Sequence, residues 1–498
     1  MLIYLIHVGF NSFKIPYIGE VISLNYMSSL LKLNGYTTNV IDCLLEGINM
    51  EDMVSNILQK NPSIVVLSFY ELNQEESLQF VKKLRGNGYL KPIVLVGIYA
   101  TLNTMHLLNA LDDMENIWCI RGEAEEAIVE FANEIKKGIS CPRLVKVAFK
   151  EDSCFYNLRH INIVKDIEVL PFPDCAVMDR VYKKMNVSVY ILSSRGCYGN
   201  CSFCILNVYN SCVTICNKQP KWRGRNVLSI ADEMEMLAHR YPNILIKFAD
   251  SNFMGYNTNR GIELSKELKR RKIKCKFAIE CRANDVEVEN FRALQEVGLV
   301  SVFLGIESGS ANVLKRYNKE ISIQQNQIAI DIIRSLKIGL KMGFILFDEY
   351  SNIDELEENT KFLHKNNSCV FHPYRPLIIE KYCIDGKAST PIMIRDEKAR
   401  LAYEIIRRTC HEIFPYRVAL DRYRKNSVQR DTDYGSTVYA ILGKFILFDK
   451  HGMNLLLSMC RDSCYSAAVV KEEFMAFVMQ FLSNIEIDLK KLEMQSII

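Results

Sequence analysis

The stretch Ser193–Cys204, SSRGCYGNCSFC, places three cysteines within eight residues. These cysteines, Cys197, Cys201 and Cys204, have the spacing C-x3-C-x2-C, with glycines before and between them. Three thiolates on one short loop can each hold one iron of a [4Fe-4S] cluster, which leaves the fourth iron open to a ligand that is not protein. A zinc site requires a fourth cysteine or histidine at paired spacing, and none follows at a spacing that fits. The loop therefore predicts an iron-sulfur cluster.

The composition around this loop is that of a large globular protein. The chain has 498 residues, of which 49% are apolar, and a prior of roughly 100 to 200 residues per domain predicts about three domains. The net charge of +4 gives no reason to expect binding to nucleic acid. No apolar run approaches the roughly 18 residues of a membrane helix, and the first residues lack the features of an export signal. We therefore expect a cytoplasmic protein whose 17 cysteines stay reduced and can bind iron.

Upstream of the loop, residues 1–140 alternate short apolar runs with amphipathic segments. Five such runs are each followed by a helical pattern, and they cover residues 2–8, 38–43, 63–69, 92–97 and 116–122. Five strand-then-helix units predict an α/β domain with a doubly wound, flavodoxin-like or Rossmann-like sheet. Ligands of such sheets bind at the carboxyl ends of the strands, where this chain has Ser68, Gly97 and Gly122.

Three further segments follow this domain. In 141–186 the periodicity fades and two prolines hold the chain extended, so we expect a linker. Residues 187–384 contain six more strand patterns, the last at 370–379, which favours a partial (β/α)6 TIM-like barrel with its chemistry at the C-terminal ends of the strands. Residues 385–498 have helical patterns and two short strand-like runs near 437–449, which predicts a mainly helical domain.

Taken together, these motifs resemble the radical S-adenosylmethionine (SAM) enzymes. The signature of that family is this cysteine spacing with an aromatic residue, here Phe203, before the last cysteine. Matching stretches elsewhere are VLPFPD, WRGRNVLSIADEME, FADSNF, ECRAND, GIESGS and GFILFD. Residues 1–140 are similar to a cobalamin-binding domain, so the resemblance covers roughly residues 1 to 380. It implies a cobalamin-dependent radical SAM enzyme whose cofactors are a [4Fe-4S] cluster, SAM and cobalamin.

The resemblance also implies SAM-binding roles for residues at the barrel strand ends. Phe203 would lie near the adenine, with a core aromatic as the alternative. Asp250 and Asn252 would bind the ribose or the substrate, although Asn252 also suits a helix N-cap. Glu307 would bind a ribose hydroxyl, with helix capping as its alternative.

Two residues of the ECRAND stretch belong together. Arg282 would make a bidentate contact to the methionyl carboxylate, whereas an ordinary ion pair is the alternative. Glu280 stands two residues earlier in the same predicted strand and therefore points to the same face. It is either a further SAM contact or the partner of that arginine.

In the first domain, Ser68, Gly97 and Gly122 would face the corrinoid, and ordinary turns are the alternative reading of the glycines. Carriers that ligate cobalt from below use the motif D-x-H-x-x-G. This chain offers His7 without the aspartate, so we expect cobalamin to bind without histidine ligation. The pairs Cys212/Cys216 and Cys460/Cys464 lack further ligands at convincing spacing, and we expect them to be inert thiols.

The activity implied by the resemblance is methylation of an unactivated carbon of a small molecule or peptide, through a 5'-deoxyadenosyl radical and methylcobalamin. A flavodoxin- or ferredoxin-like protein would supply the electrons. Two alternatives stay open: a radical cyclisation, ring contraction or oxidation without methyl transfer, and a sensor that binds the cofactors without turnover.

Overall fold

The computed structural model describes residues 1–9, 21–183, 187–371, 393–427, 432–462 and 464–497. These residues divide into two compact units. The first contains Met1–Leu304 and Ile328–Lys341, and the second contains the rest. Across the described ranges, no helix combines the length and the apolar character that spanning a bilayer would require.

The first unit opens with a seven-stranded sheet in the order β2-β1-β3-β4-β5-β6-β7. The strands are β1 (Leu2–His7), β2 (Thr37–Asp42), β3 (Ile64–Ser68), β4 (Ile93–Val96), β5 (Ile117–Cys119), β6 (Ala148–Glu151) and β7 (Cys154–Tyr156). The first five coincide with the five predicted strands and pair in parallel. Every side chain of β3 and β4 is buried, as expected for parallel strands covered on both faces. The doubly wound α/β fold is thus confirmed.

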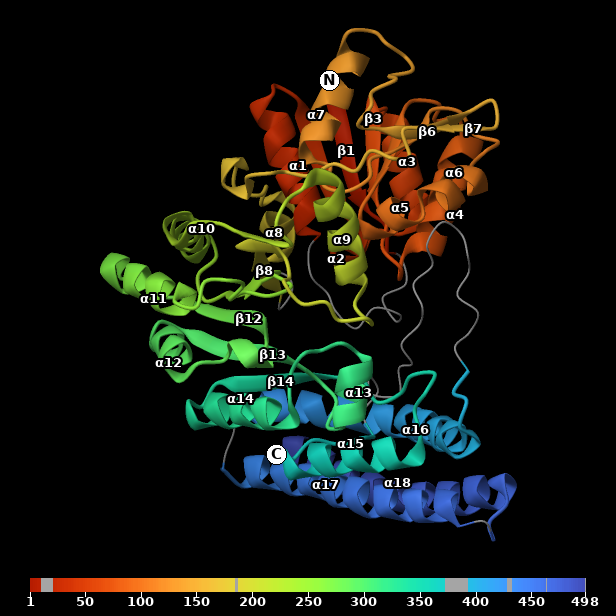
Figure 1. Ribbon diagram of the computed structural model, residues 1–498, viewed down its shortest axis with the longest axis vertical. Helices are drawn as coiled ribbons and strands as arrows, with labels where there is room; N and C mark the ends of the chain where they lie inside the picture. Colours follow the sequence, from red (N-terminus) through yellow and green to blue (C-terminus); the bar gives the residue numbers. More distant parts are fainter. Residues whose placement is uncertain (10–20, 184–186, 372–392, 428–431, 463, 498) are drawn as a thin grey trace. The chain divides into compact units, whose positions relative to one another are not determined.

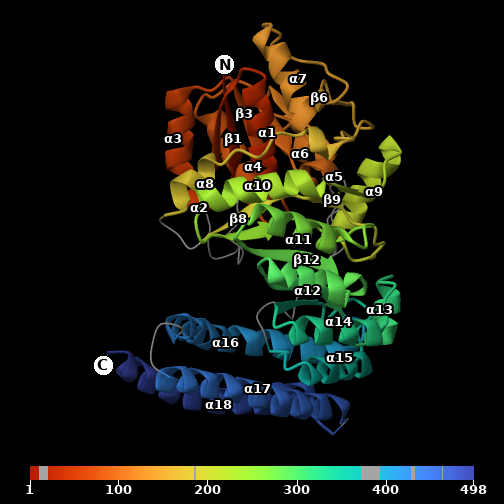
Figure 2. The same cartoon turned by 90° about the vertical axis from the view of Figure 1, so that its left-hand side faces the viewer.

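Helices cover both faces of this sheet (Figures 1 and 2). One face packs against α3, α4 and α6 in a single apolar core, and α1 contacts α7 outside that core. The helices are α1 (Ile22–Leu33), α2 (Cys43–Glu46), α3 (Met50–Lys60), α4 (Gln74–Gly86), α5 (Ile98–Leu102), α6 (Thr104–Ala110) and α7 (Glu125–Lys136).

The segment 141–186, expected to be a linker, is partly structured. Strands β6 and β7 extend the sheet in antiparallel fashion, and η1 (Ile167–Val169) and α8 (Ala176–Val181) follow. Asp152 and Ser153 join the two strands with positive φ angles of 47° and 63°, which matches a tight two-residue hairpin turn. The strands are only four and three residues long, too short for an alternating pattern to stand out in the sequence.

The second sheet carries the predicted barrel strands in the order β14-β13-β12-β11-β8. They are β8 (Ser188–Ile191), β11 (Leu245–Phe248), β12 (Lys276–Arg282), β13 (Leu299–Glu307) and β14 (Gly339–Phe344). A short antiparallel ribbon joins β9 (Ser194–Gly196) to β10 (Trp222–Gly224). The sixth predicted strand lies almost wholly outside the described residues, as does the predicted domain boundary at 384/385.

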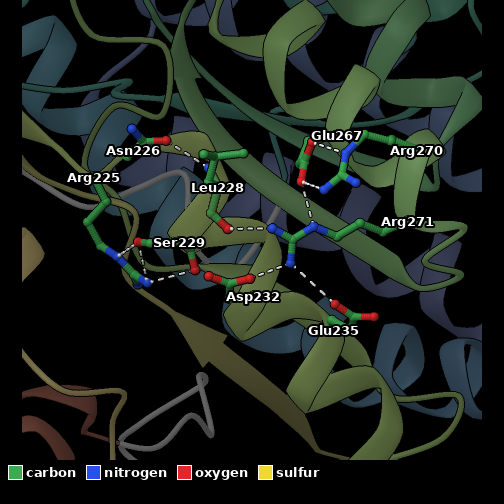
Figure 3. Close-up of polar contacts among 9 residues, drawn as sticks. All are labelled: Arg225, Asn226, Leu228, Ser229, Asp232, Glu235, Glu267, Arg270 and Arg271. Atoms are coloured by element: carbon green, nitrogen blue, oxygen red, sulfur yellow. Dashed lines mark hydrogen bonds and ion pairs between the residues drawn. The ribbon is translucent and has the colours of Figure 1, made fainter.

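Three helices lie side by side along this sheet, namely α10 (Val227–Arg240), α11 (Arg260–Arg271) and α12 (Val288–Glu296). Arg271 ties the first two together (Figure 3). Its Nε donates to Glu267 at 2.5 Å in the same helix, and its Nη1 pairs with Asp232 and Glu235 of α10. The remaining elements of this part are α9 (Ile205–Asn217) and η2 (Ala283–Asp285).

The second unit is mainly helical among its described residues, and it also includes the last residues of β13 and β14. It contains α13 (Ala311–Arg316), α15 (Ile353–Lys365), α16 (Glu397–Ser427), α17 (Thr432–Arg461), α18 (Ala467–Ile497) and part of α14 (Ile323–Ser335). The mainly helical C-terminal region is confirmed, but the two strand-like runs near 437–449 are helical and belong to α17. The buried side chains Val438, Ile441, Phe445 and Phe448 recur every three or four residues, which is the period of a helix face.

Candidate active site

The three cysteines lie on the loop between β9 and α9, and Cys204 is the last residue before that helix. Gly196 enters the loop with φ +86°, and a Cβ there would lie 1.8 Å from the carbonyl oxygen of Lys221. Only glycine allows this path, because β9 and β10 run directly against each other. Phe203 is half-buried in the turn between the second and third cysteines.

The thiols have the surroundings of cluster ligands. The backbone N–H of Gly199 donates to Cys197 Sγ at 3.4 Å, and burial raises the pKa of Cys197 and of Cys204. Iron would therefore displace protons on binding. Among the described residues, no three cysteine, histidine, aspartate or glutamate side chains converge on one metal ion. Three cysteines at this spacing fit a cluster, in which each thiolate takes a different iron.

Arg282, at the end of β12, lies against the same loop. Its Nη1 donates to Cys201 Sγ at 3.2 Å, its Nε donates to Asn284, and its guanidinium lies 5.4 Å from the centre of the Tyr198 ring. A Cβ on Gly199 would lie 2.3 Å from Nη1, so glycine makes the close approach of this arginine possible. The structure thus brings Arg282 to the cluster loop rather than to an ordinary surface ion pair.

Asp250, which follows β11, is buried beneath the start of the cluster loop. One oxygen accepts from the backbone N–H of Ser193 at 2.8 Å, and the other accepts from the hydroxyls of Ser193 and Ser194. Burial raises the pKa of Asp250, and Arg260 and these hydrogen bonds partly offset that rise. Both oxygens are thus engaged with the loop, and this geometry favours a role in holding the loop over direct contact with a ribose.

Asn252 is fully buried beside the same loop. Its Nδ2 donates to Asp285 at 2.9 Å, and its backbone oxygen accepts from Trp222 Nε1 at 2.8 Å. Asp285 in turn accepts from the Tyr198 hydroxyl, which ties this group to the residue after the first cysteine. The Oδ1 of Asn252 has no partner among the described residues. Because α11 begins eight residues later, at Arg260, the N-cap alternative is wrong.

Glu280 does not pair with Arg282. Lys247 is the register partner of Tyr190 on one side and of Ala278 on the other, so these three side chains lie on one face of the sheet. Glu280 stands two residues after Ala278 in the same strand and therefore shares that face. Its carboxylate is partly open to solvent but interacts with Lys247 and, across the sheet, with Lys341. Burial, followed by the charge of Asp250, raises the pKa of Glu280 to about 7.

Glu307 ends β13 in the second unit with φ +65°, an uncommon conformation for a residue that is not glycine. Its Oε1 accepts from Lys319 Nζ at 3.1 Å, and both side chains are buried. A Cβ on Gly305 would lie 2.6 Å from that oxygen. Glu307 therefore pairs with a lysine, and Ser310 is the N-cap residue of α13. Its ribose contact stays a prediction.

A cavity of 240 Å³ separates the carboxyl ends of the first sheet from the cluster loop. Gly97 and Gly122 line it from the first sheet, with φ angles of +105° and +85°. Ser194, Arg195 and Gly196 line it from the cluster side. The loop that should carry the iron and the edge that should carry the corrinoid thus face one space.

Ser68 is not among the residues that line this cavity. Its hydroxyl lies 3.1 Å from His7 Nδ1, and its backbone oxygen accepts from Asn73. Both side chains are buried, and burial lowers the pKa of His7 to about 4. Ser68 therefore holds a neutral imidazole, and its predicted corrinoid contact is less direct than those of the two glycines.

Comparison with known proteins identifies the domain around the cysteines. Residues 191–363 match the model of the Radical SAM superfamily. The chain contains a radical SAM domain. An uncharacterised methyltransferase of Pyrococcus horikoshii is 24% identical over 70% of this chain and 73% of its own. The 4'-phospho-dehydrooxetanocin synthase of Priestia megaterium is 25% identical over 72% of this chain and 50% of its own.

A third relative is the anaerobic magnesium-protoporphyrin IX monomethyl ester cyclase of Cereibacter sphaeroides, 26% identical over 67% of this chain. The chain spans about half the length of the synthase and of this cyclase. All three alignments are long enough to include more than the radical SAM domain, and the relatives are named for different reactions.

Two solved structures share the fold. The cobalamin-dependent radical enzyme OxsB, with aqua-cobalamin and SAM bound, superposes with a TM-score of 0.79 at 18% identity, over 100% of this chain and 81% of that chain. The radical SAM methyltransferase TsrM of Kitasatospora setae, with cobalamin and a [4Fe-4S] cluster bound, gives 0.59 at 14% identity, over 74% and 73%. The chain therefore has the fold of cobalamin-dependent radical SAM enzymes.

A buried ionic network joins the radical SAM domain to the first sheet, and sequence reasoning did not find it. Arg195 of β9 pairs with Glu123 at 3.1 Å and with Glu125, both of which follow Gly122. Arg223 of β10 also pairs with Glu123. The sequence signal for this network is weak: Arg195 stands two residues before the first loop cysteine, and Glu123 and Glu125 follow the predicted corrinoid contact Gly122 within three residues.

We expect a Glu280→Gln variant to gain stability relative to the native protein as the pH rises. The folded pKa of about 7 exceeds the ordinary value of 4.5, so the contribution of this carboxyl is fully present below pH 4.5 and is lost as the pH rises through 7. Glutamine does not ionise and avoids the loss, which is on the order of 1 kcal/mol after allowance for solvent screening. Urea unfolding of both proteins at pH 5 and pH 8 measures the difference in their free energies of unfolding. The same difference at the two pH values would contradict the prediction.

Proposed function

We propose that the protein is a cobalamin-dependent radical SAM enzyme that methylates an unactivated carbon of a small molecule or peptide. The observation that carries this proposal is the shared cavity: Gly196, next to the first cluster cysteine, lines the same space as Gly97 and Gly122. A radical formed at the cluster and a group carried by a corrinoid must meet where water is excluded.

The residues present fit these cofactors. Cys197, Cys201 and Cys204 would hold the cluster, while Gly97 and Gly122 line the cavity at the sheet edge. When bound, the cluster supplies an electron for reductive cleavage of SAM, and the corrinoid supplies a transferable methyl group. The chain's own residues then bind, orient and shield the reactants.

Two side chains support SAM binding. Arg282 brings a guanidinium to the cysteine loop, where the methionyl carboxylate would lie. Asn252 offers a buried Oδ1 that has no partner among the described residues and can accept from a ligand N–H or O–H. A ribose contact of Glu307 rests on the family resemblance alone, because its carboxylate pairs with Lys319. We further propose that a flavodoxin- or ferredoxin-like protein in a reducing compartment supplies the electron.

A second candidate is a radical cyclisation, ring contraction or oxidation without methyl transfer. The Priestia megaterium relative is a synthase and the Cereibacter sphaeroides relative is a cyclase, whereas the Pyrococcus horikoshii relative is a methyltransferase. Each aligns with about 70% of this chain at about 25% identity, so resemblance to any one of them does not select the reaction.

Product analysis separates the two. Protein reconstituted with iron, sulfide and hydroxocobalamin under anaerobic conditions is incubated with SAM and a low-potential reductant. Formation of both S-adenosylhomocysteine and 5'-deoxyadenosine supports methylation. Deoxyadenosine alone supports the second candidate, and the absence of both products contradicts the two enzyme functions.

We expect bound cobalamin to lack histidine ligation. The Nδ1 of His7 is engaged with Ser68, and no aspartate stands two residues before His7 to orient the ring. The Co(II) form should therefore show no nitrogen superhyperfine splitting in electron paramagnetic resonance, and its spectrum should not change in a His7→Ala variant. A splitting that disappears in that variant would show that the imidazole is a ligand.

A further inference from the structure

One buried donor in the cavity is unused. Asn210 lies on α9, six residues after the last cluster cysteine, and only 8% of its surface is exposed. It lines the cavity, and its Nδ2 has no hydrogen-bond partner among the described residues. A buried amide donor without a partner is costly and rare in folded proteins, so its presence beside an open space points to a ligand.

Neighbouring polar groups of the cavity are already engaged. Arg195 is paired with Glu123 and Glu125, and the Ser194 hydroxyl donates to Asp250. The Asn210 amide lies against the cluster loop, since its Nδ2 is 3.5 Å from where a Cβ on Gly196 would stand. It is therefore an unpartnered donor on the cluster side, carried by a residue that lines the space shared with the first sheet.

The cavity's charge and size indicate what this donor meets. The two arginines and two glutamates of the buried network balance, so they favour a neutral acceptor over a phosphate or carboxylate. The volume of 240 Å³ is below the roughly 300 to 1,000 Å³ of pockets that enclose a whole ligand, so it suits the edge of a larger one. Ligands of a doubly wound sheet lie at the edge that Gly97 and Gly122 form.

We propose that Asn210 donates a hydrogen bond from Nδ2 to a carboxamide oxygen on the rim of the corrinoid. Carboxamide side chains surround a corrin ring and supply neutral oxygen acceptors. The residue is thus a corrinoid contact contributed by the radical SAM domain, and it links corrinoid binding to the helix that begins at the cluster. This inference rests on the proposed function.

The test measures corrinoid affinity directly. Hydroxocobalamin is titrated into the native protein and into Asn210→Ala and Asn210→Asp variants, and the visible absorption shift is followed. Aspartate preserves the shape of asparagine but cannot donate, so both variants should bind about 3- to 10-fold more weakly, the value of one neutral hydrogen bond. Iron content and circular dichroism show that each variant is folded.

Asn103→Ala is the matched control. Asn103 is also a buried asparagine with an unpartnered side-chain atom, but it lies in the first domain and does not line the cavity. Its substitution should leave the affinity unchanged. Native affinity in both Asn210 variants, or an equal loss in the Asn103 variant, would overturn the inference alone. If the native protein binds no corrinoid, the proposed function fails as well.

Discussion

A Cys201→Ala variant is expected to lose the iron-sulfur cluster and reductive cleavage of SAM. Cys201 is buried, and its sulfur accepts from Arg282, an arrangement that the methyl group of alanine cannot reproduce. In the proposed site each thiolate would hold one iron, so the loss of one cysteine would remove one of the three proposed ligands. Iron should fall from about four per chain to below one, and 5'-deoxyadenosine formation should fall by more than the roughly 10- to 100-fold typical of outer-shell substitutions.

The matched control is a Cys460→Ala/Cys464→Ala double variant. These cysteines also stand four residues apart, but they lie at the end of α17 and in the turn that follows it. Burial raises the pKa of Cys460 to about 11, and this pair has no third ligand at a convincing spacing in the sequence. Iron content should not change in this variant. Iron near four per chain in the Cys201→Ala protein would show that the loop is not the cluster site.

The cluster loop was predictable because its ligands are neighbours in the sequence. Three cysteines lie within eight residues, and Gly196 occupies the backbone position of this loop that has a positive φ. This local pattern predicts the site without any information on tertiary contacts. Apart from the short antiparallel strands β6 and β7, the strands of both sheets were predictable for a similar reason, since buried parallel strands are continuous apolar runs. The run at 64–68, for example, is apolar up to its last residue and wholly buried.

The partners of the site residues were not predictable, because they are distant in the sequence. Asp250 holds Ser193 across 57 residues, and Arg223 reaches Glu123 across 100. A carboxylate at a strand end has the same local pattern whether it binds a ligand or a loop. Only the fold shows that Asp250 supports the loop and that Glu280 interacts electrostatically with Lys341 and Lys247 instead of pairing with Arg282.

An Arg195→Met variant is expected to lose about 3 to 5 kcal/mol of stability. Burial opposes the charged guanidinium, but Glu125 and Glu123 outweigh that effect and raise the pKa of Arg195 above its usual range. Without the arginine, Glu125 is left as a buried carboxylate with 3% of its side chain exposed. Glu123 retains Arg223, so most of the cost falls on Glu125. Urea unfolding of the native and variant proteins measures it.

A double-mutant cycle separates this pairing from lost packing. Adding Glu125→Gln to Arg195→Met removes the stranded charge, so the double variant should regain part of the lost stability. Arg240→Met is the exposed control, because its pair with Asp179 is about half open to solvent and should contribute no more than about 1 kcal/mol. Equal losses in the single and double variants would mean that packing, not charge, is what Arg195 provides. Recovery in the double variant would instead show that ion pairs between equal numbers of arginines and glutamates hold the β9–β10 ribbon at the edge of the first sheet.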